Sequence, residues 1–316
     1  MQRRSAVRNT LEYWLALAVV ESLARAPLPV ANQLARAYAR LLDLALPRLR
    51  RTAMRNLAMA LPELDRRTHR RIADGVFRSI ARLLVTFARF PRIHRGNVSQ
   101  WIRYEGYEHF EQARKHGRGV LFATAHLGNW ELSAFAHALM AAPMRVVVRP
   151  LDNPKIDALV ERRRMRSGNR LIGKRDAARG ILKALRENEA VGILVDQNAS
   201  LEEGTFVDFF GVPACAGTGF AKLAAHSGAA VIPGFALWLE NEQKYALRFY
   251  PPVEMTGDAE RDTRELHRQL EAVIREYPDQ WLWIHRRWKT RPPCEAVHGP
   301  ARVTDRPSNP RRPVTG

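Results

Sequence analysis

Residues 117–140 read GRGVLFATAHLGNWELSAFAHALM, and this stretch decides the fold. Residues 119–124 form a short, partly β-branched apolar run, which predicts a buried strand. Residues 132–140 are rich in Ala, Leu and Phe, as expected of a buried helix. His126 and Glu131 lie between these two segments. The sequence therefore places a histidine and a carboxylate at a strand-to-helix turn.

The spacing limits how these two side chains can meet. On one continuous helix, a step of five residues turns the side chain by about 500°, which leaves the two groups roughly 140° apart. They can pair only if His126 lies in the turn, where Gly128 gives backbone freedom and Asn129 can cap the helix, and Glu131 lies about one turn into the helix. A carboxylate bonded to one imidazole nitrogen leaves the other nitrogen as a base near neutral pH.

We therefore expect a dyad in which Glu131 orients His126 and His126 takes a proton from an acceptor hydroxyl. The alternative is a structural histidine, because one such match also occurs by chance.

The composition indicates an acidic partner. The chain has 316 residues, enough for one large domain or two modest ones, and 51 Lys and Arg against 32 Asp and Glu give a net charge of +19. A membrane surface, a nucleic acid or a phosphorylated substrate would satisfy this charge. Cys215 and Cys294 show no metal-ligand spacing and are interpreted as reduced.

The first hundred residues predict peripheral helices that associate with a membrane. The apolar run at residues 13–20 is too short to cross a bilayer, so we expect a helix at the membrane interface with Trp14, Leu15, Ala18 and Val19 facing lipid, or an ordinary amphipathic helix packed on the domain. A second helix is predicted over residues 31–46, then a basic turn over 47–55, then a helix capped by Asp65.

From Tyr104 onward, strands alternate with helices, which predicts an α/β domain with a central, parallel or mixed sheet flanked by helices. The expected division is a helical region over 1–100, an α/β domain over 101–292 and a disordered tail over 293–316. Strands are expected at 145–149, 191–195, 206–210, 230–239 and 245–250, and helices at 154–166, 176–187, 218–226 and 259–277.

Further polar groups occur where the predicted strands end. Arg149 leaves one strand, Asp196 ends another, and Arg164 belongs to a cationic cluster that closes a helix. Arginine forks suit phosphate oxygens, and α/β folds place ligands at this edge of the sheet. The alternative for Asp196 is a turn-forming aspartate. No phosphate-cradling or dinucleotide fingerprint is present.

The residues around His126 resemble the H-x4-D/E motif of glycerolipid-type acyltransferases, and the flanking sequence resembles the bacterial lipid A late acyltransferases, the lauroyl and myristoyl transferases. The resemblance covers about residues 50–292. The matching blocks lie at residues 56–57, 62–64, 126–131, 149–154, 164–167, 175–176, 196–197, 206–211, 227–233 and 280–289.

The resemblance implies a glycerolipid acyltransferase-like fold and transfer of a fatty acyl chain from acyl carrier protein to a hydroxyl of a lipid A precursor, at the cytoplasmic face of the inner membrane. It implies His126 as the base and Glu131 as its orienting carboxylate, with Arg149, Arg164, Asp196 and Asn129 on the substrate side. No cofactor or metal is needed, because the thioester is already activated.

Two alternatives stay open at this point. The acceptor could be another membrane lipid, such as a lysophospholipid, an aminolipid or a glycosylated phosphoinositide. The chain could instead be a basic module that binds a membrane or nucleic acid without chemistry. We expect no nucleic-acid partner, because the arginines are spread over several helices rather than along one reading helix. Trp281, Trp283 and Trp288 are more simply core or lipid contacts than base-stacking platforms.

Overall fold

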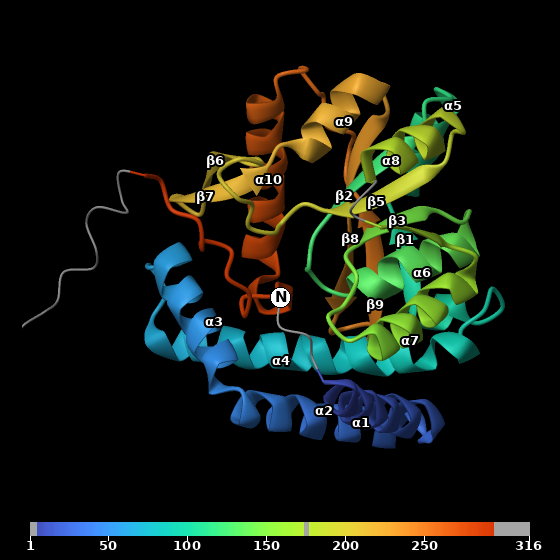
Figure 1. The fold of residues 1–316 in the computed structure, drawn as a ribbon, viewed down its shortest axis with the longest axis vertical. Coiled ribbons are helices and arrows are strands. Elements are labelled where there is room, and N and C mark those ends of the chain that lie inside the picture. The colour runs from blue at the N-terminus through green and yellow to red at the C-terminus, as the bar shows by residue number, and fades with distance from the viewer. Residues whose placement is uncertain (1–4, 174–176, 294–316) are drawn as a thin grey trace, which may run out of the picture.

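A seven-stranded sheet organises the protein, in the order β1-β9-β8-β2-β5-β3-β4. The structure is a computed structural model that describes residues 5–173 and 177–293 (Figure 1). Neighbouring strands run parallel except β8 and β9, which are antiparallel, so the predicted mixed sheet is confirmed. The strands are β1 (Ile102–Glu105), β2 (Val120–Thr124), β3 (Arg145–Val148), β4 (Arg170–Gly173), β5 (Ala190–Leu194), β8 (Ala230–Leu239) and β9 (Lys244–Phe249).

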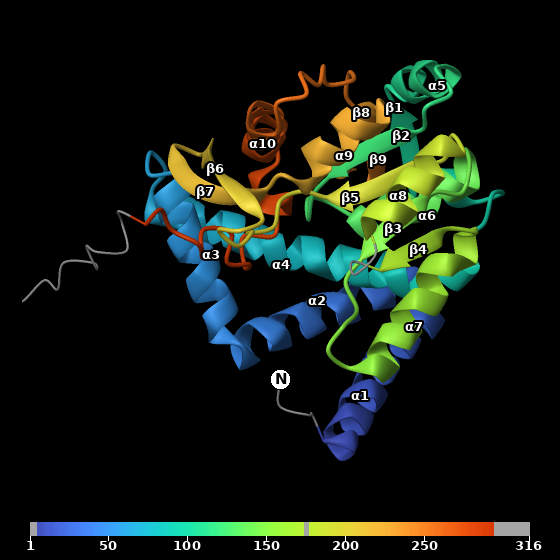
Figure 2. The same cartoon turned by 45° about the horizontal axis from the view of Figure 1, so that its top comes forward.

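Helices cover both faces of this sheet, as predicted, and the alternation of side chains along β2 explains how (Figure 2). On one face, Val120 and Phe122 pack with residues of α4 (Arg66–Arg89), α5 and α6. On the other face, Leu121 and Ala123 pack with residues of α8, α9 and α10. The central strand is therefore buried on both sides. The helices of this part are α5 (Tyr107–Lys115), α6 (Trp130–Met140), α7 (Pro154–Arg164), α8 (Ala177–Arg186), α9 (Gly219–Ser227) and α10 (Ala259–Glu276).

Four helices precede the sheet: α1 (Ala6–Arg25), α2 (Leu28–Ala45), α3 (Pro47–Ala60) and α4 (Arg66–Arg89). The basic turn predicted over 47–55 is wrong, because Pro47 stands in the first turn of α3, where a proline is favourable. Asp65 caps α4 as predicted, with its carboxylate accepting a hydrogen bond from the Thr68 N–H at 2.7 Å.

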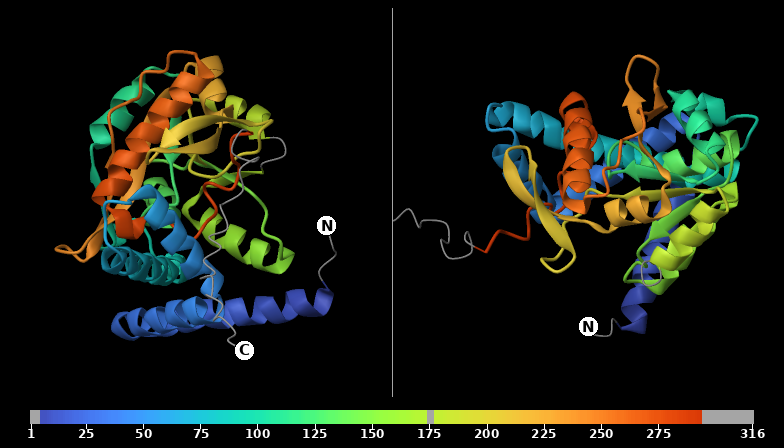
Figure 3. Two further views of the ribbon diagram at one scale, coloured as in Figure 1. Left: turned by 90° about the vertical axis from the view of Figure 1, so that its left-hand side faces the viewer. Right: turned by 90° about the horizontal axis from the view of Figure 1, so that it is seen from above.

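The expectation that all these helices are peripheral is wrong for α4. One side of α4 packs against α1 and α2 through Phe77, Ala81 and Val85. Its other side places Ile72 and Val76 in a core that also holds Trp281, Trp283 and Trp288. These tryptophans are therefore core residues, which is one of the two roles expected for them, the other being contact with lipid. Helices α1 and α2 form an outer layer against α4 (Figure 3).

A separate hairpin, β6 (Gly204–Phe209) and β7 (Val212–Gly217), lies outside the sheet. A strand was expected at residues 206–210, which corresponds to β6, whereas no strand was predicted where β7 lies. The two residues between the strands, Phe210 and Gly211, both have positive φ, as a tight type I′ hairpin turn requires. The glycine at 211 therefore serves a β-turn.

No helix within residues 5–173 and 177–293 is long and apolar enough to cross a membrane. On α1, Trp14, Leu15 and Ala18 are exposed as expected, whereas Val19 packs against the core formed with α4. Cys215 is buried and free. Cys294 and all but the first residue of the predicted tail, 293–316, lie outside the described residues.

The turn after β2 is fixed by hydrogen bonds to two other segments and by a cap on α6. Gly128 N–H donates to the Gln280 carbonyl at 3.0 Å, and Asn129 N–H donates to the Ala236 carbonyl at 2.8 Å. Asn129 caps α6 as predicted, accepting from the Leu132 N–H at 3.0 Å. Gly128 has a φ of +61°, and an added Cβ would lie 1.9 Å from the Ala236 carbonyl oxygen. This turn has no room for a side chain at position 128.

Gly128→Ala should therefore destabilise the protein far more than Gly117→Ala. Gly117 also has a positive φ of +72°, but an added Cβ would meet nothing within 4 Å. We expect Gly117→Ala to cost about 1–2 kcal/mol from backbone strain alone. Gly128→Ala should cost roughly 3 kcal/mol or more, because strain and the collision with the β8 backbone add. Thermal unfolding of both variants measures this, and equal melting temperatures would contradict the packing described for the turn.

Candidate active site

His126 lies at the end of β2 and is bonded to Asp196 at the end of β5. Its Nδ1 is 2.9 Å from Asp196 Oδ1, and its backbone N–H donates to Asp196 Oδ2 at 2.9 Å. The strands β2 and β5 are parallel neighbours, with Thr124 paired to Leu194, so the two residues that follow meet at the same edge of the sheet. Trp281 Nε1 donates a third hydrogen bond to Asp196 at 2.9 Å.

This bond determines which nitrogen of His126 is free. A carboxylate only accepts hydrogen bonds, so the proton lies on Nδ1 and Nε2 is the basic nitrogen. Burial lowers the pKa of His126, but the charge and hydrogen bond of Asp196 raise it by more, so the net pKa is above its ordinary value. Burial raises the pKa of Asp196. The charge and hydrogen bond of His126, the charge of His285 and the hydrogen bond from Trp281 lower it by more, so the pKa of this carboxyl is well below its usual range.

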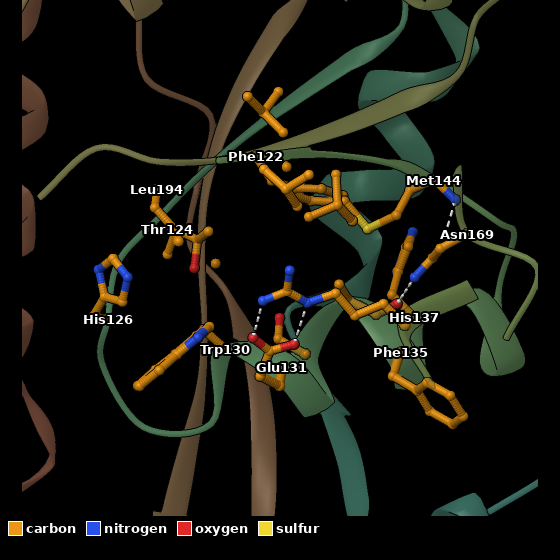
Figure 4. A pocket seen from close by; sticks show the side chains of 18 of the residues that line it. Phe122, Thr124, His126, Trp130, Glu131, Phe135, His137, Met144, Asn169 and Leu194 are labelled. Carbon is orange, nitrogen blue, oxygen red and sulfur yellow. Dashed lines mark hydrogen bonds and ion pairs between the residues drawn. The ribbon is translucent and has the colours of Figure 1, made fainter. Parts of the chain in front are cut away.

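Glu131 does not orient His126, which corrects the predicted dyad. Its carboxylate instead forms a two-bond pair with the guanidinium of Arg164, at 2.9 and 2.5 Å. The reason is geometric: Glu131 is the second residue of α6, and Arg164 is the last residue of α7. In Figure 4, dashed lines mark the two hydrogen bonds at the Glu131 carboxylate. Glu131 still lines the same cavity as His126, and its charge contributes to the raised pKa of that histidine.

Two residues predicted to contact the substrate, Asn129 and Asp196, are instead buried and hydrogen-bonded within the protein. Asn129 is fully buried, and its side chain caps α6 and donates to Thr86 Oγ1 at 2.7 Å. Asp196 is also fully buried behind His126. Neither side chain lines the cavity, because internal hydrogen bonds hold both of them inside the protein. Asp196 therefore contacts His126 and not the cavity.

A cavity of about 460 Å³ opens beside His126 and extends between the sheet and α6. Figure 4 shows His126 and Trp130 on one side of it, with Phe135, His137 and Met144 on the other. Arg149 and Arg164 both line this cavity, as does Gln197. Most of the remaining wall is apolar and consists of Phe122, Ala134, Phe135, Met144, Val146, Val147, Val148, Leu194, Leu247 and Phe249.

The two cavity arginines differ in how free they are. Arg164 is committed to Glu131, and only 24% of its side chain is exposed. Arg149 is exposed and has no ion pair within the described residues. Of the two, Arg149 is therefore the cation available to an acidic group that reaches the cavity.

The inner wall contains a polar side chain that sequence analysis missed. His137 is 2% exposed, and its Nδ1 lies 3.1 Å from the Tyr104 hydroxyl. Burial lowers the pKa of His137 to about 3, so it is neutral. Its position on α6, six residues after Glu131, would have indicated a residue deeper along the same helix.

No group of three or more His, Cys, Asp and Glu side chains suited to a metal ion occurs in the part of the chain that the structure describes. The site consists of a histidine hydrogen-bonded to a carboxylate, a cavity with a mainly apolar wall, and Arg149, which has no ion pair among the described residues. A neutral imidazole held in this way can accept a proton from a hydroxyl.

Comparison with known proteins gives a consistent result. Residues 1–290 match the sequence profile of the bacterial lipid A biosynthesis acyltransferases. The chain is 29% identical to the lipid A biosynthesis lauroyltransferase of Escherichia coli K12 over 282 residues, 88% of this chain and 92% of that protein. It is 32% identical to the lipid A biosynthesis palmitoleoyltransferase of the same strain over 222 residues, 70% of this chain and 72% of that protein.

A further relative is the lipid A biosynthesis myristoyltransferase of the same strain, 23% identical over 284 residues, 89% of this chain and 88% of that protein. These matches set aside the interpretation of the chain as a binding module without chemistry. The family resemblance seen in the sequence is confirmed: the chain belongs to the bacterial lipid A biosynthesis acyltransferases and is an acyltransferase.

Proposed function

We propose that this protein transfers a fatty acyl chain from the thioester of acyl carrier protein to a hydroxyl of a lipid A precursor, at the cytoplasmic face of the inner membrane. The observation that carries the proposal is the His126–Asp196 pair at one side of a mainly apolar cavity. The choice of a lipid A precursor as the acceptor is supported by the names of the relatives, since each is a lipid A biosynthesis acyltransferase.

The chemistry needs one proton acceptor and one proton donor. His126 Nε2 takes the proton from the acceptor hydroxyl, while the hydroxyl oxygen attacks the carbonyl carbon of the thioester. The carbon–sulfur bond then breaks, and the imidazolium returns the proton to the departing thiolate. Asp196 stabilises the imidazolium between these steps, because its buried charge lies 2.9 Å from Nδ1.

The cavity suits the hydrocarbon part of the donor. Its inner wall consists mainly of Phe, Val, Leu and Met side chains, and an acyl chain there would be removed from water. Arg149 lies at the exposed rim and would hold a phosphate or other acidic group of the acceptor. Arg164 would act indirectly, by holding Glu131 at the cavity wall.

A row of exposed apolar residues on α1 supports membrane association. Val7, Leu11, Trp14 and Leu15 are each between 59% and 70% exposed, and their spacing puts them on one side of the helix. Helix α1 lies beside α7, where Asn153 Nδ2 donates to the Asn9 carbonyl at 2.9 Å (Figure 2). Leu151, two residues before Asn153, lines the cavity. A lipid layer that holds α1 would therefore be close to the cavity rim.

A transfer assay tests the function. The purified protein is given acyl carrier protein thioesters and two acceptor pools, a tetra-acylated lipid A precursor and mixed lysophospholipids. We expect transfer to the lipid A precursor, and a loss of about 10²-fold or more in His126→Ala. Circular dichroism checks that the variant is folded. Transfer only to lysophospholipids would move the proposal to another acceptor, and full activity in His126→Ala would refute the catalytic assignment.

The pH dependence tests the partner of the base. The reactive form of His126 is neutral, so kcat/KM should fall as the pH falls through its pKa, which Asp196 holds above the ordinary 6.5. In Asp196→Asn the negative charge is gone while burial remains, so this fall should move to lower pH, and turnover should drop by about 10²–10⁴-fold. Glu131→Gln is the comparison variant and should shift the profile less, because Glu131 acts on His126 only through space.

A pH profile that moves more in Glu131→Gln than in Asp196→Asn would restore Glu131 as the orienting carboxylate. A profile that stays fixed in both variants would mean that a different group titrates.

Charge on α1 should release the protein from membranes. We expect Leu11→Glu combined with Leu15→Glu to reduce sedimentation with anionic phospholipid vesicles by about tenfold or more, because two charges would enter the lipid interface. Leu201→Glu is a control for an acidic substitution at an exposed leucine outside α1, although it adds one charge rather than two: Leu201 is 52% exposed and lies in the loop before β6. Equal sedimentation of the α1 variant and wild type would show that α1 does not bind lipid.

A further inference from the structure

The outer surface between α3 and the start of α4 forms a groove of about 800 Å³. We propose that this groove, named here the α3–α4 groove, docks an acidic helix of the protein that delivers the acyl thioester. The inference rests on the proposed function, because it assigns a place to the carrier protein of that reaction. The groove is lined by Arg50, Arg51, Met54, Arg55, Ala58, Pro62, Arg66, His69, Arg70 and Asp74.

The lining of the groove combines apolar and cationic side chains. Met54, Ala58 and Pro62 supply apolar surface, while Arg51 and Arg55 come from α3 and Arg66 and Arg70 come from α4. Amphipathic helices bind in grooves by placing apolar side chains at helical spacing against the apolar part of the lining. Acidic side chains beside that apolar row would then meet the arginines.

Four arginines that line the groove have no acidic partner within the described residues, whereas the neighbouring Arg50 has two. Arg50 is held by Asp43 and Asp74 at 2.6 and 2.7 Å. Arg51, Arg55, Arg66 and Arg70 are exposed and form no ion pair there. Helix α3 contains no Asp or Glu at all. A helix face that serves only for solubility normally mixes both signs of charge, so this one-sided charge indicates an acidic partner.

The shape of the groove favours a helix over a membrane. A flat lipid surface would touch the outermost side chains of the two helices and leave the groove between them unfilled. An α-helix with side chains is about 10–12 Å across, and its convex surface can enter a groove between two helices. The exposed apolar row suited to lipid lies instead on α1.

The groove is also close to the catalytic histidine. The opposite face of α3 is buried, and Asn56 on that face donates to the carbonyls of Trp283 and His285, both at 2.8 Å. The ring of His285 lies 6.4 Å from the ring of His126. Asn56 thus links α3 to a segment that lies beside His126. A carrier docked in the groove would present its thioester, on a flexible arm, at this side of the protein. Figure 1 shows α3 at the same end of α4 as the β6–β7 hairpin.

The test compares two double charge reversals with the same change in net charge. Arg51→Glu with Arg55→Glu alters the groove, and Arg36→Glu with Arg40→Glu alters exposed arginines of α2 outside it. We expect the groove variant to raise the KM for acyl carrier protein thioester by about tenfold or more relative to its KM for acyl-pantetheine, which has no protein part. The α2 variant should change this ratio less than twofold.

Binding of fluorescently labelled acyl carrier protein, followed by anisotropy, gives a readout that needs no catalysis. A Kd that rises at least tenfold only in the groove variant supports the proposal, even if the transfer assay shows a different acceptor. Equal weakening in both variants would mean that general charge, not the groove, attracts the carrier. Unaltered binding in the groove variant, or weaker sedimentation with anionic vesicles in place of weaker carrier binding, would overturn the proposal.

Discussion

The buried carboxylate of Asp196 is the constraint on which the site depends. It is fully buried and accepts three hydrogen bonds, two from His126 and one from Trp281. A buried charge is tolerated only when such partners surround it. These bonds connect the ends of β2 and β5 with the segment that follows α10. His126 is therefore oriented by the same carboxylate that ties the segment after α10 to the sheet.

A second buried charge lies near this carboxylate. Arg287 is fully buried, donates to the Cys215 carbonyl at 2.7 Å and lies over the ring of Phe209. Burial lowers the pKa of Arg287 to about 10, which still leaves it cationic at neutral pH. Its positive charge and the negative charge of Asp196 offset part of each other's burial cost. The sequence around residues 281–288 thus serves the core and the electrostatics of the site together.

The secondary structure could be predicted from local patterns, whereas the partner of the histidine could not be read from local spacing. The strand at 230–239 and the cap at Asp65 have local signals and were predicted correctly. The short strand β4 and the strand β7 were missed, because four to six residues with charged or small side chains give little periodicity. Helix α3 was missed because its arginines and Pro47 resemble a turn.

The carboxylate that pairs with His126 is also decided by tertiary structure and not by distance along the chain. Glu131 is five residues from His126 in the chain, but α6 turns it toward Arg164. Asp196 is 70 residues away, yet the parallel pairing of β2 with β5 brings it within hydrogen-bond distance. The rule that the carboxyl ends of parallel strands meet at one edge could have found this pair, had it been applied to Asp196 and His126 together. The two carboxylates thus have different partners. Asp196 is hydrogen-bonded to His126 and raises its pKa, whereas Glu131 is paired with Arg164, so that Arg149 is the cavity arginine without an ion pair among the described residues.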